Sequence, residues 1–97
     1  MYTLYWSKRT AAIAPDSVLS EAGAEFVRKE VKRTAGRVDD PEFERISPMK
    51  QIPALQLPDG TVLCESLAIS LALAERLPDA DILPPLGSNE RALVYRW

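Results

Sequence analysis

The alternation of apolar and polar residues along the first third of the chain predicts a strand, a helix and a second strand. Residues 2–6 are rich in aromatic and β-branched side chains, which is typical of a strand. After a polar connection over residues 7–12, apolar residues recur at helical spacing up to Gly23, a residue suited to the position after a helix. The predicted apolar face of this helix comprises Ile13, Val18, Leu19 and Ala22. Residues 26–31 then predict a second strand, and its many charges are typical of a sheet edge.

The middle of the chain predicts a loop and a short helix. Residues 34–37 have the composition of a loop. Asp39 or Asp40 precedes Pro41, and an acidic N-cap followed by a proline in the first turn is a common way for a helix to start. We expect this helix to carry Phe43 as an apolar residue.

The next stretch predicts a hairpin followed by a longer apolar helix. Residues 53–57 and 61–64 have strand composition, and residues 58–60, Pro-Asp-Gly, are typical of a tight turn. A helix is expected over residues 66–77 and closed by Pro78. The apolar residues of this helix, which we expect to pack in the core, are Leu67, Ile69, Leu71, Leu73, Ala74 and Leu77.

The order of these elements predicts an α/β fold of the form βαβ followed by ββα. A helix that connects the first two strands makes them parallel, whereas a hairpin is antiparallel, so we expect a four-stranded mixed sheet. We expect helices on both faces of this sheet and a first domain over residues 1–78. A proline-rich linker over 79–87 would then lead into residues 88–97, the first helix of an all-helical second domain, since Ser88 is suited to an N-cap and no stop signal follows.

Composition and charge exclude several classes of function. The 97 residues carry a formal net charge of −2, which argues against nucleic acid or an anionic membrane as a partner. There is no histidine, so a histidine-based triad is excluded and we expect no metal. Cys64 is the single cysteine, which excludes an internal disulfide and a CxxC pair and favours a reducing cytoplasm. No apolar stretch approaches the ~20 residues that a membrane span needs.

The most specific motifs lie in the second half of the chain. Residues 51–55 read Gln-Ile-Pro-Ala-Leu, and residues 63–69 read Leu-x-Glu-Ser-x-Ala-Ile. Near the start, residues 4–7 read Leu-Tyr-Trp-Ser and residues 14–15 read Ala-Pro. With the order of elements, these motifs resemble the thioredoxin-like N-terminal domain of the glutathione S-transferase family, and the start resembles its bacterial, beta-class members. The resemblance implies a glutathione transferase that uses glutathione as its co-substrate, conjugates it to a small electrophile and forms a homodimer.

The resemblance also implies a glutathione-binding role for Gln51, Ile52, Pro53, Glu65 and Ser66. In this family the peptide before the proline is cis, which turns the backbone of Ile52 outward to pair with the cysteinyl unit of glutathione as a short added strand. The free N–H groups of a helix start, with the Ser66 hydroxyl, suit the γ-glutamyl carboxylate, and Glu65 suits the ammonium group. Two purely structural interpretations stay open, in which Pro53 begins an edge strand and Ser66 caps a helix.

The chain departs from the family at the position that activates the thiol. A thiol with a pKa of about 8.5 is mostly protonated at neutral pH, so the family places a hydroxyl or a cysteine near the end of the first strand. Alignment with beta-class members puts Ala11 and Ala12 at the positions of the family's cysteine and the adjacent serine, and neither alanine can act on sulfur. The remaining hydroxyls of this loop are Ser7 and Thr10, our catalytic candidates, with Tyr5 third. Otherwise Ser7 and Thr10 are turn hydroxyls that cap the first helix.

Two hypotheses of different class follow. The first is a glutathione transferase in which the second domain supplies most of the electrophile pocket. We therefore expect residues 1–97 alone to be inactive, and the identity of the electrophile does not follow from them. The second is a non-catalytic, regulatory or protein-interaction module that keeps the glutathione site. A glutaredoxin-like reductase is disfavoured by the missing CxxC, and Cys64 is expected to be an inert residue on the opposite face of its strand from Leu63. The residues that could bind the glycyl carboxylate of glutathione are Lys32, Arg33 and Arg37. In the alternative interpretation, these residues only form a charged face exposed to solvent.

Overall fold

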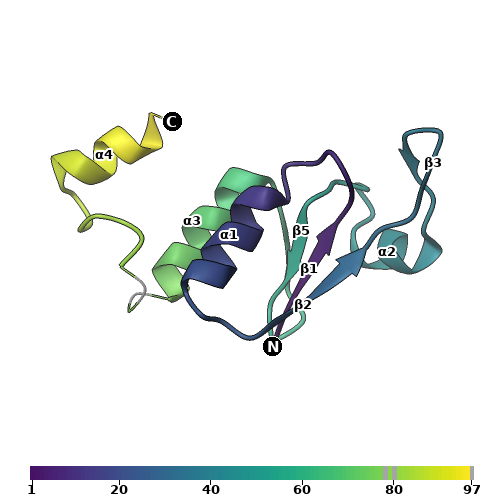
Figure 1. Ribbon diagram of the computed structural model, residues 1–97, viewed down its shortest axis with the longest axis horizontal. Helices are drawn as coiled ribbons and strands as arrows, with labels where there is room; N and C mark the ends of the chain where they lie inside the picture. The colour runs from purple at the N-terminus through teal and green to yellow at the C-terminus, as the bar shows by residue number, and fades with distance from the viewer. Residues whose placement is uncertain (78, 80, 97) are drawn as a thin grey trace.

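Four strands form a mixed sheet in the computed structural model, which describes residues 1–77, 79 and 81–96 (Figure 1). In spatial order the strands are β2 (Phe26–Glu30), β1 (Tyr2–Trp6), β5 (Ala54–Gln56) and β6 (Val62–Cys64). β1 and β2 are parallel, whereas β5 is antiparallel to both β1 and β6. The predicted α/β fold and its mixed sheet are confirmed, and the charged strand β2 lies at an edge of the sheet as expected.

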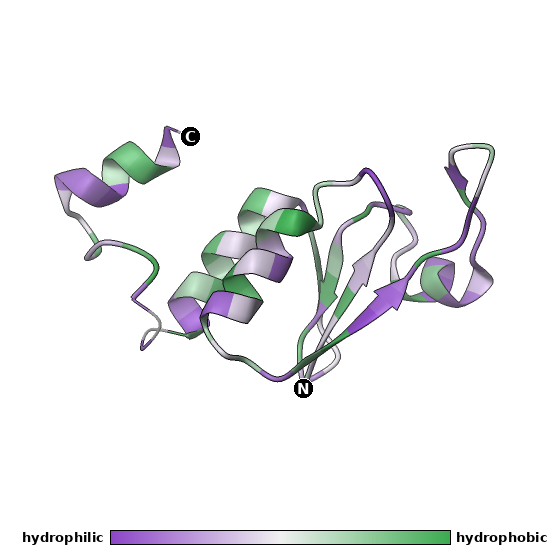
Figure 2. Ribbon diagram, viewed as in Figure 1, coloured by the Kyte–Doolittle hydropathy of each residue, from purple (hydrophilic) through white to green (hydrophobic). Residues whose placement is uncertain are grey.

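Helices cover both faces of the sheet. The helices α1 (Ile13–Glu21) and α3 (Ser66–Arg76) lie side by side against one face, and α2 (Pro41–Ile46) lies against the other (Figure 1). Figure 2 shows apolar residues along α1 and α3, and hydrophilic residues along β2. This is the βαβ–ββα arrangement that the pattern of apolar residues predicts.

The alternation of side chains along β1 divides the core into two clusters. Leu4 points to the α1 and α3 face, where the fully buried residues of the first cluster are Leu4, Leu19, Leu55, Ile69 and Leu73. Tyr5 points to the α2 face, where it packs against Phe43 with ring centroids 5.3 Å apart, a distance typical of a favourable aromatic pair. Successive residues of a strand point to opposite faces, so a single strand supplies both clusters.

Side chains and glycine at the helix ends satisfy the backbone as the sequence predicts. Asp40 caps α2 by accepting a hydrogen bond from the Phe43 N–H at 3.2 Å, and Pro41 is the first residue of that helix. Beyond α1, Gly23 has a φ of 66°, and the N–H groups of Gly23 and Ala24 donate to the carbonyls of Ser20 and Leu19. This pair of bonds is the Schellman motif, in which glycine adopts the left-handed conformation without a steric penalty.

Three details of the predicted elements are wrong. Residues 34–37 were expected to form a loop, but they belong to a small antiparallel hairpin of β3 (Arg33–Thr34) and β4 (Arg37–Val38). Ile13 and Leu67 were expected in the core, but their side chains are 76% and 57% exposed. Each lies two residues before a buried residue of its helix, and two residues correspond to about 200° around a helix axis, so both point away from the sheet.

A linker leads from α3 to a last helix, α4 (Asn89–Tyr95). Ser88 is its N-cap and accepts a hydrogen bond from the Arg91 N–H at 3.1 Å, as the sequence predicts. The predicted role of Pro78 as the end of the preceding helix lies outside the described residues, as does Trp97. Within the described part of the chain, no helix has the length and apolar composition to cross a bilayer.

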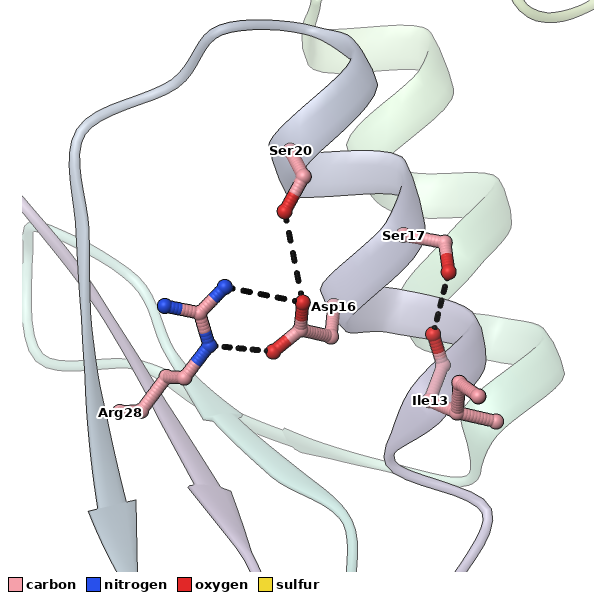
Figure 3. A network of polar contacts seen from close by, with 5 residues as sticks. All are labelled: Ile13, Asp16, Ser17, Ser20 and Arg28. Atoms are coloured by element: carbon pink, nitrogen blue, oxygen red, sulfur yellow. Dashed lines mark hydrogen bonds and ion pairs between the residues drawn. The ribbon is translucent and has the colours of Figure 1, made fainter.

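An ion pair ties α1 to the edge strand β2. Asp16 on α1 and Arg28 on β2 form a two-pronged contact in which Nε of Arg28 lies 2.5 Å from Oδ2 and Nη2 lies 3.0 Å from Oδ1 (Figure 3). Ser20, one turn further along α1, also donates to the Asp16 carboxylate. The hydrogen bond from Arg28 lowers the pKa of Asp16 below its ordinary value.

Candidate functional site

A depression of about 200 Å³ gathers residues from three separate segments of the chain. Its lining comprises Ala11, Gln51, Ile52, Pro53, Glu65 and Ser66. Five of these are the residues to which the sequence assigns glutathione binding, and the sixth is the alanine at the position of the family's cysteine. The depression therefore lies where the start of α1, the segment before β5 and the start of α3 meet.

The segment before β5 presents a backbone that is free to bind a ligand. The Ile52–Pro53 peptide is cis, as the family resemblance implies. Pro53 is buried, and Ile52 packs its side chain against the cluster that contains Phe43. Within the described residues, neither the N–H nor the C=O of Ile52 takes part in a backbone hydrogen bond. These two groups can therefore pair with an extended peptide.

Glu65, and not Ser66, occupies the N-cap position of α3. Its φ of 72° lies in the left-handed region, which is uncommon for a residue other than glycine, and its side chain makes no capping bond. Ser66 is the first helical residue, so the purely structural interpretation of Ser66 as an N-cap is wrong. No hydrogen bond is made by the Ser66 hydroxyl with any other described residue, whereas the Ser66 carbonyl accepts one from Ser70.

The start of α3 has the chemistry of a site for an amino acid. The first backbone hydrogen bond into this helix runs from the Ile69 N–H to the Glu65 carbonyl, which leaves the N–H groups of residues 66–68 without an intrahelical partner. Free N–H groups and the positive end of the helix dipole attract a carboxylate. The exposed carboxylate of Glu65 offers a partner of opposite sign for an ammonium group.

The two catalytic candidates of the first loop do not line this depression. The Thr10 hydroxyl donates a hydrogen bond to the Ser7 carbonyl at 2.7 Å, and Ser7 is only 8% exposed. Both residues line other cavities, which lie around the same loop. Among the described residues of the depression, Ser66 carries the only hydroxyl, and Ala11 is the residue that the first loop contributes.

Tyr5, the third hydroxyl candidate, is a core residue. Its ring is 4% exposed, and its phenol oxygen lies 3.5 Å from Oε1 of Gln56. Burial raises the pKa of Tyr5, and the charges of Glu42 and Asp40 raise it further. These surroundings keep the phenol protonated and directed into the core.

Cys64 also takes the structural role that the sequence predicts. It packs with the cluster on the α2 face, whereas Leu63 packs with the cluster on the α1 and α3 face. Its Sγ lies 3.6 Å from the hydroxyl oxygen of the buried Ser47. The part of the chain that the structure describes contains no group of histidine, cysteine or acidic side chains placed to hold a metal ion.

A basic cavity adjoins the depression through Ile52, which lines both. This hairpin cavity, of about 460 Å³, contains the side chains of Arg33, Arg37 and Lys50. Arg33 and Arg37 are sequence candidates for the glycyl carboxylate, whereas Lys32 lines a neighbouring cavity. Lys50 was not predicted, although its place beside Gln51 is a signal that could have drawn attention to it.

Comparisons with known proteins agree with this geometry. Residues 1–75 match the family described as "Glutathione S-transferase, N-terminal domain". Glutathione S-transferase GstA of Escherichia coli O157:H7 is 32% identical over 95 residues, which are 97% of this chain and 47% of that protein. The structure of a glutathione transferase from Methylococcus capsulatus str. Bath has a TM-score of 0.88 at 34% identity, over 100% of this chain and 48% of its own.

A second solved structure carries the ligand that the depression suggests. It is a glutathione transferase homologue from Sulfitobacter with bound glutathione, with a TM-score of 0.86 at 29% identity, over 99% of this chain and 46% of its own. The fold and the match over residues 1–75 place this chain in the glutathione S-transferase N-terminal domain family. The chain spans about half the length of these relatives.

Proposed function

We propose that the chain is the glutathione-binding domain of a glutathione transferase. The observation that carries this proposal is the convergence of Gln51, Ile52, Pro53, Glu65 and Ser66 on one depression. These residues come from two segments that the fold brings together. One segment offers the free main-chain groups of Ile52, and the other offers the Glu65 carboxylate, the Ser66 hydroxyl and the free N–H groups of α3. The Sulfitobacter homologue with bound glutathione supports the same ligand.

Glutathione lies in this proposal as an extended peptide across the depression. Its γ-glutamyl carboxylate accepts hydrogen bonds from the Ser66 hydroxyl and the free N–H groups of α3, and its ammonium group faces Glu65. The cysteinyl unit pairs with the backbone of Ile52, and Gln51 is a polar neighbour. The glycyl carboxylate continues past Ile52 into the hairpin cavity, where Arg33 and Arg37 supply positive charge.

The proposed reaction of the whole protein is the transfer of the glutathione sulfur to a small electrophile. Such a reaction needs the thiolate, which a hydrogen-bond donor near the sulfur stabilises. Ser7 and Thr10 remain the proposed hydroxyls for this role, and either would have to turn toward the sulfur during the reaction, because neither lines the depression. As the family resemblance implies, we also propose that the whole protein is a cytoplasmic homodimer that uses glutathione as its co-substrate.

The alternative function, a module that binds glutathione without turnover, is favoured by one specific observation. Ala11 lines the depression at the position of the family's cysteine, and a methyl group neither donates a hydrogen bond nor forms a disulfide. An assay of turnover with a small aromatic electrophile separates the two functions. The assay uses a longer protein, in which this chain is joined to the part that its relatives have in addition. Measurable turnover supports the transferase, and glutathione binding without turnover supports the module.

Isothermal titration calorimetry of this chain with glutathione tests the proposed site. We expect saturable binding of glutathione and much weaker binding of cysteinylglycine, which lacks the γ-glutamyl unit. The loss of charge-assisted bonds to the γ-glutamyl group should weaken binding by at least ~1.5–3 kcal/mol. Equal affinity for the two ligands would contradict the assignment of the α3 start to the γ-glutamyl group.

A further inference from the structure

Two basic cavities meet at the β3–β4 hairpin. The hairpin cavity holds Arg33, Arg37 and Lys50, as described above. The second, which we call the loop cavity, has a volume of about 740 Å³ and lies between the β1–α1 loop and the segment after β2. Its charged lining residues are Lys8, Arg9, Glu30, Lys32 and Arg33. The two cavities therefore share Arg33 and together contain six cationic side chains against one acidic side chain, in a chain with a net charge of −2.

Arg33 is fixed at the junction of the two cavities without a carboxylate partner. Its Nη1 donates to the Lys8 carbonyl at 3.0 Å, and its Nη2 donates to the Gly36 carbonyl at 3.3 Å. These bonds tie the β1–α1 loop to the hairpin and leave the guanidinium charge unneutralised. Among the described residues of the two cavities, Lys50 is the one cation within 4.0 Å of a carboxylate, that of Glu44.

The loop cavity has few acidic groups nearby, and the acidic side chains of the adjoining segment already accept other hydrogen bonds. Asp40 accepts hydrogen bonds from the backbone N–H groups of Lys32 and Phe43, and Asp39 accepts one from the Thr34 hydroxyl. Glu30 is the acidic residue of the lining itself. A concentration of like charge destabilises a folded chain unless an anion binds to it, so this surface is suited to an anionic ligand.

The glycyl carboxylate of glutathione accounts for only part of this charge. In the proposed function it enters the hairpin cavity beside Ile52, where one carboxylate faces Arg37 and Arg33. Lys8 and Arg9 in the loop cavity then make no ion pair with a described residue, whereas the charge of Lys32 interacts with that of Asp40. Lys8 and Arg9 belong to the loop that runs directly to Ala11, which lines the glutathione depression. An anion in the loop cavity is therefore held on a segment that, two residues after Arg9, lines the glutathione depression.

We propose that the loop cavity binds the carboxylate of the second substrate, so that the electrophile joined to glutathione is an anionic compound, such as an α,β-unsaturated carboxylic acid. This inference rests on the proposed function. In the reaction the sulfur forms a bond to the β-carbon, the π electron pair moves to the α-carbon, and the α-carbon takes a proton from water while the thiol proton passes to solvent. Lys8 and Arg9 hold the carboxylate in place and take no part in the bond changes.

The test uses succinate, an unreactive dicarboxylate, and succinamide, its neutral counterpart. Backbone amide signals of the chain are followed by NMR, first with glutathione to saturation and then with either probe. We expect succinate to bind the glutathione-saturated chain and to shift signals of residues 7–9 and 32–33, and succinamide to bind at least about tenfold more weakly. The double variant Lys8→Gln/Arg9→Gln should lose a similar factor in succinate affinity, whereas Arg45→Gln, an exposed arginine of α2, should not.

The possible failures can be told apart. If glutathione binds but succinate does not, or if saturating glutathione displaces succinate, the loop cavity has no ligand of its own and this inference is overturned, while the proposed function stands. Equal binding of succinate and succinamide would also overturn it. If glutathione itself fails to bind, the proposed function is contradicted and this inference falls with it.

Discussion

The hydroxyl of Thr10 donates a hydrogen bond of 2.7 Å to the carbonyl oxygen of Ser7, within the loop that joins β1 to α1. This bond closes a turn and commits the better exposed of the two candidate hydroxyls to the backbone. Ser7 itself is buried, and the small depression at Ile52 and Ser66 is lined from this side by Ala11. The turn thus stabilises the loop. The Thr10 hydroxyl can donate a hydrogen bond to a thiolate only if it gives up its bond to the Ser7 carbonyl.

We therefore expect Ser7→Ala and Thr10→Val to change the affinity for glutathione little, because neither hydroxyl lines the depression and valine keeps the shape of the Thr10 side chain in the hairpin cavity. Thr10→Val should instead lower the free energy of unfolding by ~0.5–1.5 kcal/mol, since it removes the bond to Ser7. Calorimetry and urea unfolding measure the two quantities on the same samples. A tenfold loss of affinity in either variant, with stability unchanged, would place that hydroxyl at the ligand.

Substitutions at the start of α3 should have the opposite profile. Ser66→Ala and Glu65→Gln are each expected to weaken glutathione binding by ~1.5–3 kcal/mol, because each removes a hydrogen bond or an ion pair to a charged group of the ligand. Ser66 is not the N-cap, so Ser66→Ala should change stability little. Cys64→Ser is the matched control, since Cys64 adjoins Glu65 in sequence but packs in the core. If all three variants bind glutathione equally, the γ-glutamyl group lies elsewhere.

Ala11→Cys offers a covalent test of the ligand's position. In a Cys64→Ser background, the thiol introduced by Ala11→Cys should attack oxidised glutathione, form a mixed disulfide and release one glutathione thiolate. The depression lined by Ala11 and Ile52 holds the disulfide in reach, so the reaction should be faster than with Ala12→Cys. Ala12 is buried and does not line the depression, which makes it a suitable control. Mass spectrometry over time follows both variants, and equal rates would show that Ala11 is not beside the bound sulfur.

The Asp16–Arg28 pair predicts a pH dependence of stability. The hydrogen bond from Arg28 lowers the pKa of Asp16 in the folded chain, so the carboxylate stabilises the fold above its ordinary pKa of 3.8. This contribution is lost as the pH falls through the lowered pKa of the folded state. In urea unfolding, Asp16→Asn should therefore be less stable than the original chain at pH 7, and the gap should close in strong acid. A gap that is unchanged at acid pH would show that the pair does not stabilise the contact between α1 and β2.

Local signals explain why much of the fold could be predicted from the sequence. Leu4 and Tyr5 point to opposite faces of β1 because neighbouring residues of a strand alternate, and their two clusters follow from that alone. Asp40 caps α2 and Gly23 follows α1 because each residue type has the geometry that its position requires.

The errors arose where packing between elements decides the outcome. The apolar character of Ile13 and Leu67 suggested burial, but their angular positions relative to the sheet depend on how α1 and α3 are rotated. The β3–β4 hairpin is too short to show a strand pattern, and Arg33 is held there by the Lys8 carbonyl from a distant loop. The candidate site needed both kinds of information, because motif residues identified Ile52 and Ser66, whereas only the folded chain shows Ala11 beside them.

An NMR titration of this chain with glutathione locates the bound ligand residue by residue. We expect the largest shifts of backbone amide signals at Ile52 and at residues 66–68, where free N–H groups meet the ligand, and a smaller shift at Ala11. Signals of α4 should not move, since that helix contributes nothing to the depression. The absence of saturable shifts at Ile52 and Ser66, or shifts confined to other parts of the chain, would contradict the glutathione site proposed here.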